Sequence, residues 1–152
     1  MGAVVRIILI AEDNDEDLIA FQRVMRRSNG PPLVRCRDGE DVLNYLTNPP
    51  DGTTHLPSLI LLDLNMPGTD GRETLARLKS DPDFRSIPTV VFSTSSSPKD
   101  VDYCYDQGAN GYMSKPVKYT DLEDILLGFV EYWDKIMILP PPKILSERGP
   151  AQ

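Results

Sequence analysis

Cysteine, histidine and tryptophan are scarce in this chain, and long hydrophobic runs are missing. The 152 residues include two cysteines, one histidine and one tryptophan. Cys36 and Cys104 lie far apart and in no metal-ligand spacing, so we expect a reduced, cytoplasmic environment without a structural metal. No apolar stretch approaches the roughly 18 residues of a membrane span. No secretory signal pattern precedes the first apolar run.

Positive charge is also in short supply. Lysine and arginine total 16 against 23 aspartates and glutamates, which gives a net charge of -7. This balance disfavours non-specific attraction to nucleic acid or to an anionic membrane surface. We therefore expect protein partners, no direct nucleic-acid binding and no membrane attachment.

The sequence does contain short apolar runs that alternate with helical patterns. The expected strands cover residues 4–11, 32–37, 58–63, 88–94 and 111–115. The expected helices begin near Asp15, Asp38, Asp70, Ser97 and Thr120. Five βα units of this length predict an α/β fold with a doubly wound parallel sheet and helices on both faces. We place this single domain at residues 1–135.

The expected helix ends have signals of their own. Acidic residues after Asp15 suit the positive end of a helix dipole. Asp70 and Glu73 have the spacing of a capping box. Gly30 and Gly108 are expected to end the first and fourth helices.

Polar side chains end four of the five expected strands. Glu12 and Asp13 follow the first strand, and Asp63 ends the third. Because chemistry in an open parallel sheet gathers beyond the carboxyl ends of its strands, we expect these carboxylates to share one crevice. Such crowding is unfavourable unless a hard cation such as Mg²⁺ neutralises it. Ser93 and Lys115 end the last two strands and could bind a phosphoryl group, which an aspartate can itself accept.

The segment Asp63-Leu64-Asn65-Met66-Pro67-Gly68-Thr69-Asp70-Gly71 adds a family likeness to these strand-end residues. With them, it makes residues 4–135 resemble a response-regulator receiver domain. The resemblance implies a flavodoxin-like (βα)5 sheet with strand order 2-1-3-4-5. It also implies a phosphorylated switch of two-component signalling rather than an enzyme, with a histidine kinase as donor and with self-catalysed phosphotransfer and dephosphorylation.

The resemblance implies a metal-binding role for four residues. Asp63 is the expected phosphoacceptor. Asp13 and Asp63 are expected to bind Mg²⁺ together with the backbone carbonyl of Asn65, and Glu12 is expected to support the metal through water.

The resemblance implies a second set of roles around the phosphoryl group. Ser93 and Lys115 are expected to bind it, with Thr94 beside it where many relatives have a smaller residue. Tyr112 is the expected switch aromatic, and a cis peptide bond is expected before Pro116.

Simpler interpretations of the same residues stay open. Asn65 could be only a turn residue, Ser93 could satisfy a loop amide, and Lys115 could pair with a carboxylate structurally. Tyr112 could be simple packing. His55 is expected to be a solvated loop residue, so the phosphoryl donor is expected to be another protein.

The segment 136–152 is expected to be a C-terminal extension. It follows a last helix that already has a core-facing stripe, so its apolar residues are in surplus. The residues expected at a homodimer interface are Leu127, Tyr132, Trp133, Ile136, Met137, Ile138 and Leu139. The alternative is that the extension folds back on its own domain. The pattern also resembles the regulators that partner cyanobacterial and bacterial phytochromes, which implies a light-sensing histidine kinase.

A phosphatase and an unphosphorylated scaffold are the alternatives to a phosphoacceptor switch. A Mg²⁺-dependent phosphatase with an aspartyl-phosphate intermediate commonly has a second aspartate two residues after the nucleophile, where this chain has Asn65. An unphosphorylated scaffold would not need the intact acidic set. The residues after 135 are too few for a DNA-binding output domain, so output is expected through a protein contact or onward phosphotransfer. The role of the long loop at 48–57 stays open.

Overall fold

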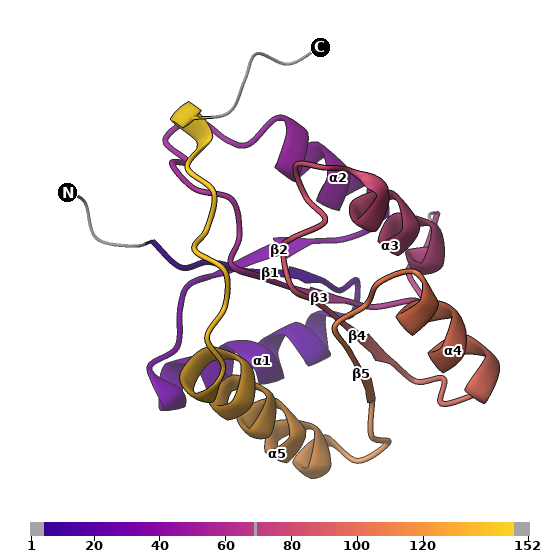
Figure 1. Ribbon diagram of the computed structural model, residues 1–152. Coiled ribbons are helices and arrows are strands. Elements are labelled where there is room, and N and C mark those ends of the chain that lie inside the picture. The colour runs from indigo at the N-terminus through magenta and orange to yellow at the C-terminus, as the bar shows by residue number, and fades with distance from the viewer. Residues whose placement is uncertain (1–4, 69, 148–152) are drawn as a thin grey trace.

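The structure is a computed structural model, described over residues 5–68 and 70–147 (Figure 1). Its strands are β1 (Ile8–Ala11), β2 (Leu33–Cys36), β3 (Leu59–Leu62), β4 (Thr89–Ser93) and β5 (Gly111–Ser114). Its α-helices are α1 (Asp15–Ser28), α2 (Gly39–Thr47), α3 (Gly71–Ser80), α4 (Pro98–Asp106) and α5 (Tyr119–Val130). A π-helical turn (Glu131–Ile136) continues α5, and a 3-10 turn follows at Leu145–Glu147. Residues 1–4 of the expected domain, Thr69 of the motif segment and residues 148–152 of the extension lie outside the described residues.

The five strands form one parallel sheet in the order β2-β1-β3-β4-β5. The flavodoxin-like fold class is therefore confirmed. Each observed strand lies within its expected range because every strand is a short apolar run between polar segments. Within the described residues, no helix is long and apolar enough to cross a membrane.

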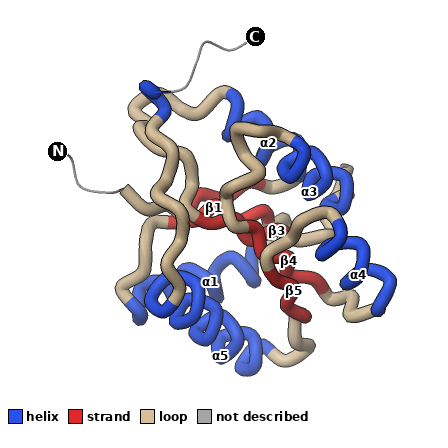
Figure 2. The backbone as a smooth tube through the Cα atoms, in the orientation of Figure 1, coloured by secondary structure: helices blue, strands red, loops and turns tan. Residues whose placement is uncertain are grey.

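Helices cover both faces of the sheet, as Figure 2 shows. Alternate strand residues point to opposite faces, so β1 sends Leu9 to one core and Ile10 to the other. The first core lies under α2, α3 and α4 and includes Cys36 and Cys104, both free thiols. The second lies under α1 and α5, where Phe21 and Phe129 meet edge to face with ring centroids 5.8 Å apart.

Several helix ends differ from the sequence expectation. Asn29, not Gly30, takes the left-handed conformation that ends α1, with a φ of 55°. Asp70 caps the N–H of Arg72, so the expected capping-box pairing with Glu73 is replaced by a bond one residue earlier. The last helix begins at Tyr119, which puts Thr120 inside its first turn. Short polar side chains can cap more than one neighbouring amide, so sequence spacing alone does not choose among them.

The C-terminal extension folds back in part on its own domain, as the yellow segment of Figure 1 shows. Its backbone accepts a hydrogen bond from Leu56 N at Lys143 O (2.9 Å) and donates one from Leu145 N to Thr54 O (2.9 Å). Lys143 Nζ also donates to Asp83 O at 2.8 Å. The extension therefore pairs with the end of the long loop before β3.

The apolar surplus of the last helix and the extension divides into two groups. Leu127, Trp133 and Leu139 are partly buried against their own core. The seven residues expected at the interface are therefore not all exposed to a partner. The exposed members are Tyr132, Ile136, Met137 and Ile138.

Candidate functional site

Strand register brings the predicted site residues together at one edge of the sheet. Ala11 pairs with Leu62, so the carboxylates that follow them are neighbours, and Asp63 N donates to Ala11 O at 3.1 Å. On the other side, Lys115 N donates to Ser93 O at 2.7 Å. Backbone pairing therefore places the ends of β1, β3, β4 and β5 around one crevice.

Lys115 is the electrostatic centre of this crevice. Its ammonium lies 2.6 Å from Glu12 Oε2, 3.1 Å from Asp63 Oδ2 and 3.2 Å from Asp17 Oδ2. The side chain is 8% exposed, and those of Glu12 and Asp63 are 2% and 6% exposed. Water screens these charges little, so the Coulomb attraction is stronger than in a surface ion pair, but burial also removes the hydration of the charged groups.

Burial and crowding shift the pKa values of all three groups. Burial raises the pKa of Glu12 to about 7 although Lys115 opposes that change. Burial also raises the pKa of Asp63, again against the pull of Lys115. For Lys115, burial alone disfavours the charge, but the carboxylates of Glu12 and Asp63 outweigh it and its pKa is raised.

The carboxylates fit a divalent metal ion. Oxygens of Glu12, Asp13 and Asp63 all lie within 4.8 Å of one another. Together with Asp17, four carboxylates line the crevice, and one ammonium, that of Lys115, lies among them. A bound cation would therefore improve the charge balance of the crevice. It is a cavity of about 260 Å³. Hard divalent cations prefer oxygen ligands of this kind.

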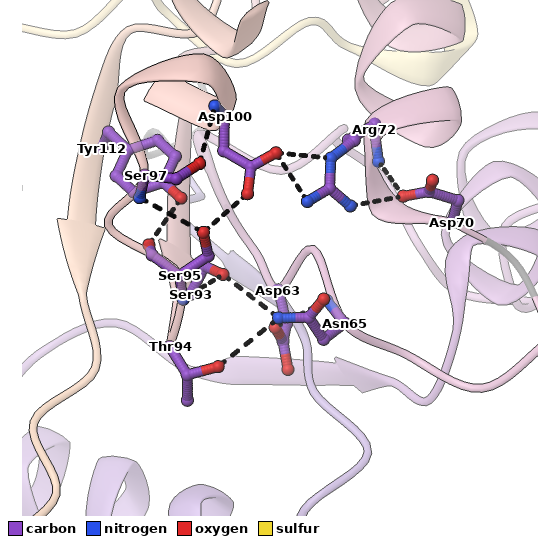
Figure 3. Close-up of polar contacts among 10 residues, drawn as sticks. All are labelled: Asp63, Asn65, Asp70, Arg72, Ser93, Thr94, Ser95, Ser97, Asp100 and Tyr112. Atoms are coloured by element: carbon purple, nitrogen blue, oxygen red, sulfur yellow. Dashed lines mark hydrogen bonds and ion pairs between the residues drawn. The ribbon is translucent and has the colours of Figure 1, made fainter. Parts of the chain in front are cut away.

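Hydroxyl and amide groups line the β4 side of the crevice (Figure 3). Asn65 N donates to Asp63 Oδ1 at 3.0 Å. The Asn65 side-chain amide donates to Ser93 Oγ at 3.3 Å and to Thr94 Oγ1 at 3.5 Å. Asn65 is therefore more than a turn residue, because its amide joins the β3 loop to the end of β4.

Tyr112 lies beside this group and not within it. Its hydroxyl donates to Ser95 O at 2.7 Å, and its ring packs against the core under α2, α3 and α4. Its role as a switch aromatic stays a prediction. The expected cis bond before Pro116 is wrong for this structure, since the described residues contain no cis peptide bond. A trans bond is the default even before proline.

His55 does not line the crevice. It is partly buried, not fully solvated, and forms an antiparallel bridge with Ile144 of the extension. Its Nδ1 is 2.8 Å from Thr54 Oγ1.

Two site residues escaped sequence analysis. Asp17 was grouped with the acids that suit the dipole of α1, yet it reaches Lys115. The signal was its position four residues before the buried Phe21, on the inward face of the helix. Arg35 is a charged residue within the short, otherwise apolar strand β2, and this unusual position was its signal. Its Nε donates to Glu12 O at 2.9 Å and its Nη1 lies 2.7 Å from Asp15 Oδ1, so it fixes the loop after β1.

Residues 8–127 match the family described as the response regulator receiver domain, and the chain belongs to this family. Receiver domains act as signalling switches.

Three relatives cover nearly the whole chain. The probable methanogenesis regulatory protein FilR2 of Methanothrix harundinacea is 36% identical over 84% of this chain and 83% of its own length. Response regulator Rcp1 of Synechocystis is 36% identical over 89% of this chain and 93% of its own length. The crystal structure of the phosphorylated cyanobacterial phytochrome response regulator RcpA has a TM-score of 0.83 at 38% identity, covering 90% of this chain and 99% of that one.

A solved form of Rcp1 bears on the metal. The crystal structure of the Mn²⁺-bound form of response regulator Rcp1 has a TM-score of 0.83 at 36% identity, covering 89% of this chain and 99% of that one. Together with the carboxylate cluster, this likeness fits divalent metal binding by this receiver domain.

Proposed function

We propose that this chain is a phosphoacceptor response regulator that receives a phosphoryl group on Asp63 from the phosphohistidine of a histidine kinase, with Mg²⁺ bound. The observation that carries the proposal is the buried Asp63 carboxylate, which accepts a hydrogen bond from Lys115 Nζ on one oxygen and from the backbone N–H of Asn65 on the other. Phosphorylation would change the charge of this crevice and thereby switch a protein-interaction face.

The chemistry assigned to each residue follows from its position. An Asp63 oxygen attacks phosphorus, a P–O bond forms, the P–N bond to histidine breaks, and the imidazole leaves. Lys115 then pairs with a phosphoryl oxygen, and the Ser93 hydroxyl donates to another. Asp13, Asp63 and the backbone carbonyl of Asn65 would hold Mg²⁺, with Glu12 acting through water. The ion would offset the negative charge of the phosphoryl oxygens.

Labelling with acetyl phosphate tests the proposal directly. We expect stoichiometric label on the wild-type chain only when Mg²⁺ is present. Asp63→Asn should abolish the label, because it removes the nucleophile while nearly preserving side-chain size. Asp121→Asn, which changes an exposed carboxylate at the start of α5, is the matched control and should label normally. Persistent stoichiometric label on Asp63→Asn would place the phosphoacceptor elsewhere.

We also propose a phytochrome-type light sensor as the kinase partner. The support is the likeness to RcpA, which is itself a phytochrome response regulator. A phosphotransfer profile against the histidine kinases of the source organism measures this. The phytochrome-type kinase should label Asp63 fastest, and equal or faster transfer from an unrelated kinase would contradict the pairing.

We also propose a homodimer that uses the exposed apolar residues at the end of the last helix and in the extension. Ile138 is 97% exposed and Ile136 is 62% exposed, and neighbouring Tyr132 and Met137 are exposed as well. Exposed aliphatic side chains gathered in this way usually mark a partner surface.

A further inference from the structure

An arginine–aspartate pair joins the start of α3 to the start of α4, close to the phosphoryl crevice (Figure 3). Arg72 donates to Asp100 Oδ1 from Nε at 2.9 Å and from Nη2 at 2.7 Å. The two side chains are 29% and 19% exposed. Two charge-assisted hydrogen bonds in partial burial fix both position and orientation, which a single exposed contact does not do.

The second oxygen of Asp100 holds the loop after β4. Ser95 Oγ donates to Asp100 Oδ2 at 2.6 Å. The backbone of Ser95 is held as well, since its N–H donates to Ser93 Oγ at 3.1 Å and its carbonyl accepts from the Tyr112 hydroxyl at 2.7 Å. The Ser95 hydroxyl also accepts a hydrogen bond from Ser97 N at 3.4 Å. These four contacts hold Ser95, and the one to Ser93 Oγ leads directly to the hydroxyl proposed to bind the phosphoryl group.

These contacts hold the Ser93 oxygen in its present position while leaving its O–H able to donate. The Ser93 hydroxyl oxygen already accepts hydrogen bonds from Ser95 N and from the side-chain amide of Asn65. When Ser93 turns to donate to a phosphoryl oxygen, its oxygen moves and the Ser95 N–H must follow or lose its partner. The contact of the Ser95 hydroxyl with Asp100 Oδ2 opposes that movement.

Arg72 has a second partner that makes release possible. Its Nη1 lies 3.1 Å from Asp70 Oδ1, the cap of α3. An arginine that leaves Asp100 would thus keep a carboxylate partner.

We propose that Arg72 and Asp100 form a latch that holds the loop at residues 94–97 in the phosphoryl-free arrangement and so opposes phosphorylation of Asp63. The latch rests on the proposed function, because it regulates that same site. Linkage makes it reciprocal: a contact present only in one state must weaken any ligand that prefers the other state. A pair that only fastened α3 to α4 would stabilise the fold and leave the crevice unaffected.

Beryllofluoride binding tests the latch with a phosphoryl mimic. The variants are Arg72→Gln, Asp100→Asn and their combination, titrated at saturating Mg²⁺ by calorimetry. We expect each single variant to bind beryllofluoride about five-fold more tightly than wild type, at the low end of usual coupling between sites. The double variant should bind beryllofluoride as tightly as each single variant, since all of them break the same Arg72–Asp100 pair. The Mg²⁺ affinity of each variant should stay within roughly two-fold of wild type, which is the usual effect of a surface substitution.

A matched control separates the latch from general loss of an ion pair. Arg27→Gln breaks an arginine–carboxylate pair between α1 and α5, where Arg27 Nη1 lies 3.5 Å from Glu123 Oε2. Its beryllofluoride affinity should equal that of wild type. Arg72→Lys retains charge but not the two-N–H fork, so it should give an intermediate gain and serves if Arg72→Gln does not fold.

The outcomes are distinct for the two proposals. Wild-type protein that binds no beryllofluoride with Mg²⁺ overturns the proposed function, and the latch with it. Wild-type binding, combined with unchanged or weaker binding by folded Arg72 and Asp100 variants, overturns the latch alone.

Discussion

At the scale of single residues, Glu12 should make metal binding depend on pH. Burial raises its pKa from 4.5 to about 7, so below pH 7 it carries a proton and contributes less negative charge to the metal that it is proposed to support through water. We expect Mg²⁺ affinity to rise with pH by up to about ten-fold per unit below this pKa and to level off above it. Magnesium titrations at pH 5.5, 7 and 8.5 measure the dependence.

The same proton fixes the sign of the effect on stability. Between pH 4.5 and about 7 the folded chain keeps a proton that the unfolded chain has released, so the contribution of Glu12 to the free energy of unfolding falls as pH rises across this window. Added Mg²⁺ should restore stability most above pH 7. Glu12→Gln should flatten both dependences, and an unchanged pH profile in that variant would assign them to another group.

At the scale of elements, the sequence was most informative where one physical rule dominated. The strands and their order were predictable because the apolar runs are short and evenly separated by helical patterns. The end of α1 and the start of α5 were not predictable in the same way. Asn29 takes the C-cap position of α1, which Gly30 could also have filled, and Lys118 takes the N-cap position of α5, which Thr120 could also have filled. Such choices differ by fractions of a kcal/mol to about 2 kcal/mol and are decided by tertiary packing.

The candidate site shows the same division. Strand-end residues such as Asp63 and Lys115 were predictable, since parallel pairing brings strand tips together whatever the details of packing. Asp17 and Arg35 reach the site from the side of a helix and from an edge strand, so their inclusion depends on how α1 and β2 pack. The latch on Ser95 depends in the same way on how α3 approaches α4.

At the scale of the whole molecule, one part of the extension contacts its own domain and another part is exposed. Beyond Leu139 it pairs with its own domain, while Ile136 and Ile138 just before remain exposed. Removing everything after Lys135 would therefore disturb the fold as well as the surface. Substituting the two isoleucines is the cleaner test of a dimer.

The variant Ile136→Ser/Ile138→Ser should shift the chain from dimer to monomer in sedimentation at micromolar concentration. Burying an aliphatic side chain contributes about 1.5–3 kcal/mol, so two per chain can offset much of the cost of association, although area alone does not set affinity. Val117→Ser is the matched control, because Val117 is fully exposed in the loop between β5 and α5 and its loss should leave the dimer intact. A wild-type chain that stays monomeric at high micromolar concentration, with and without beryllofluoride, would show that these isoleucines face water in the working protein. The extension would then serve its own domain only.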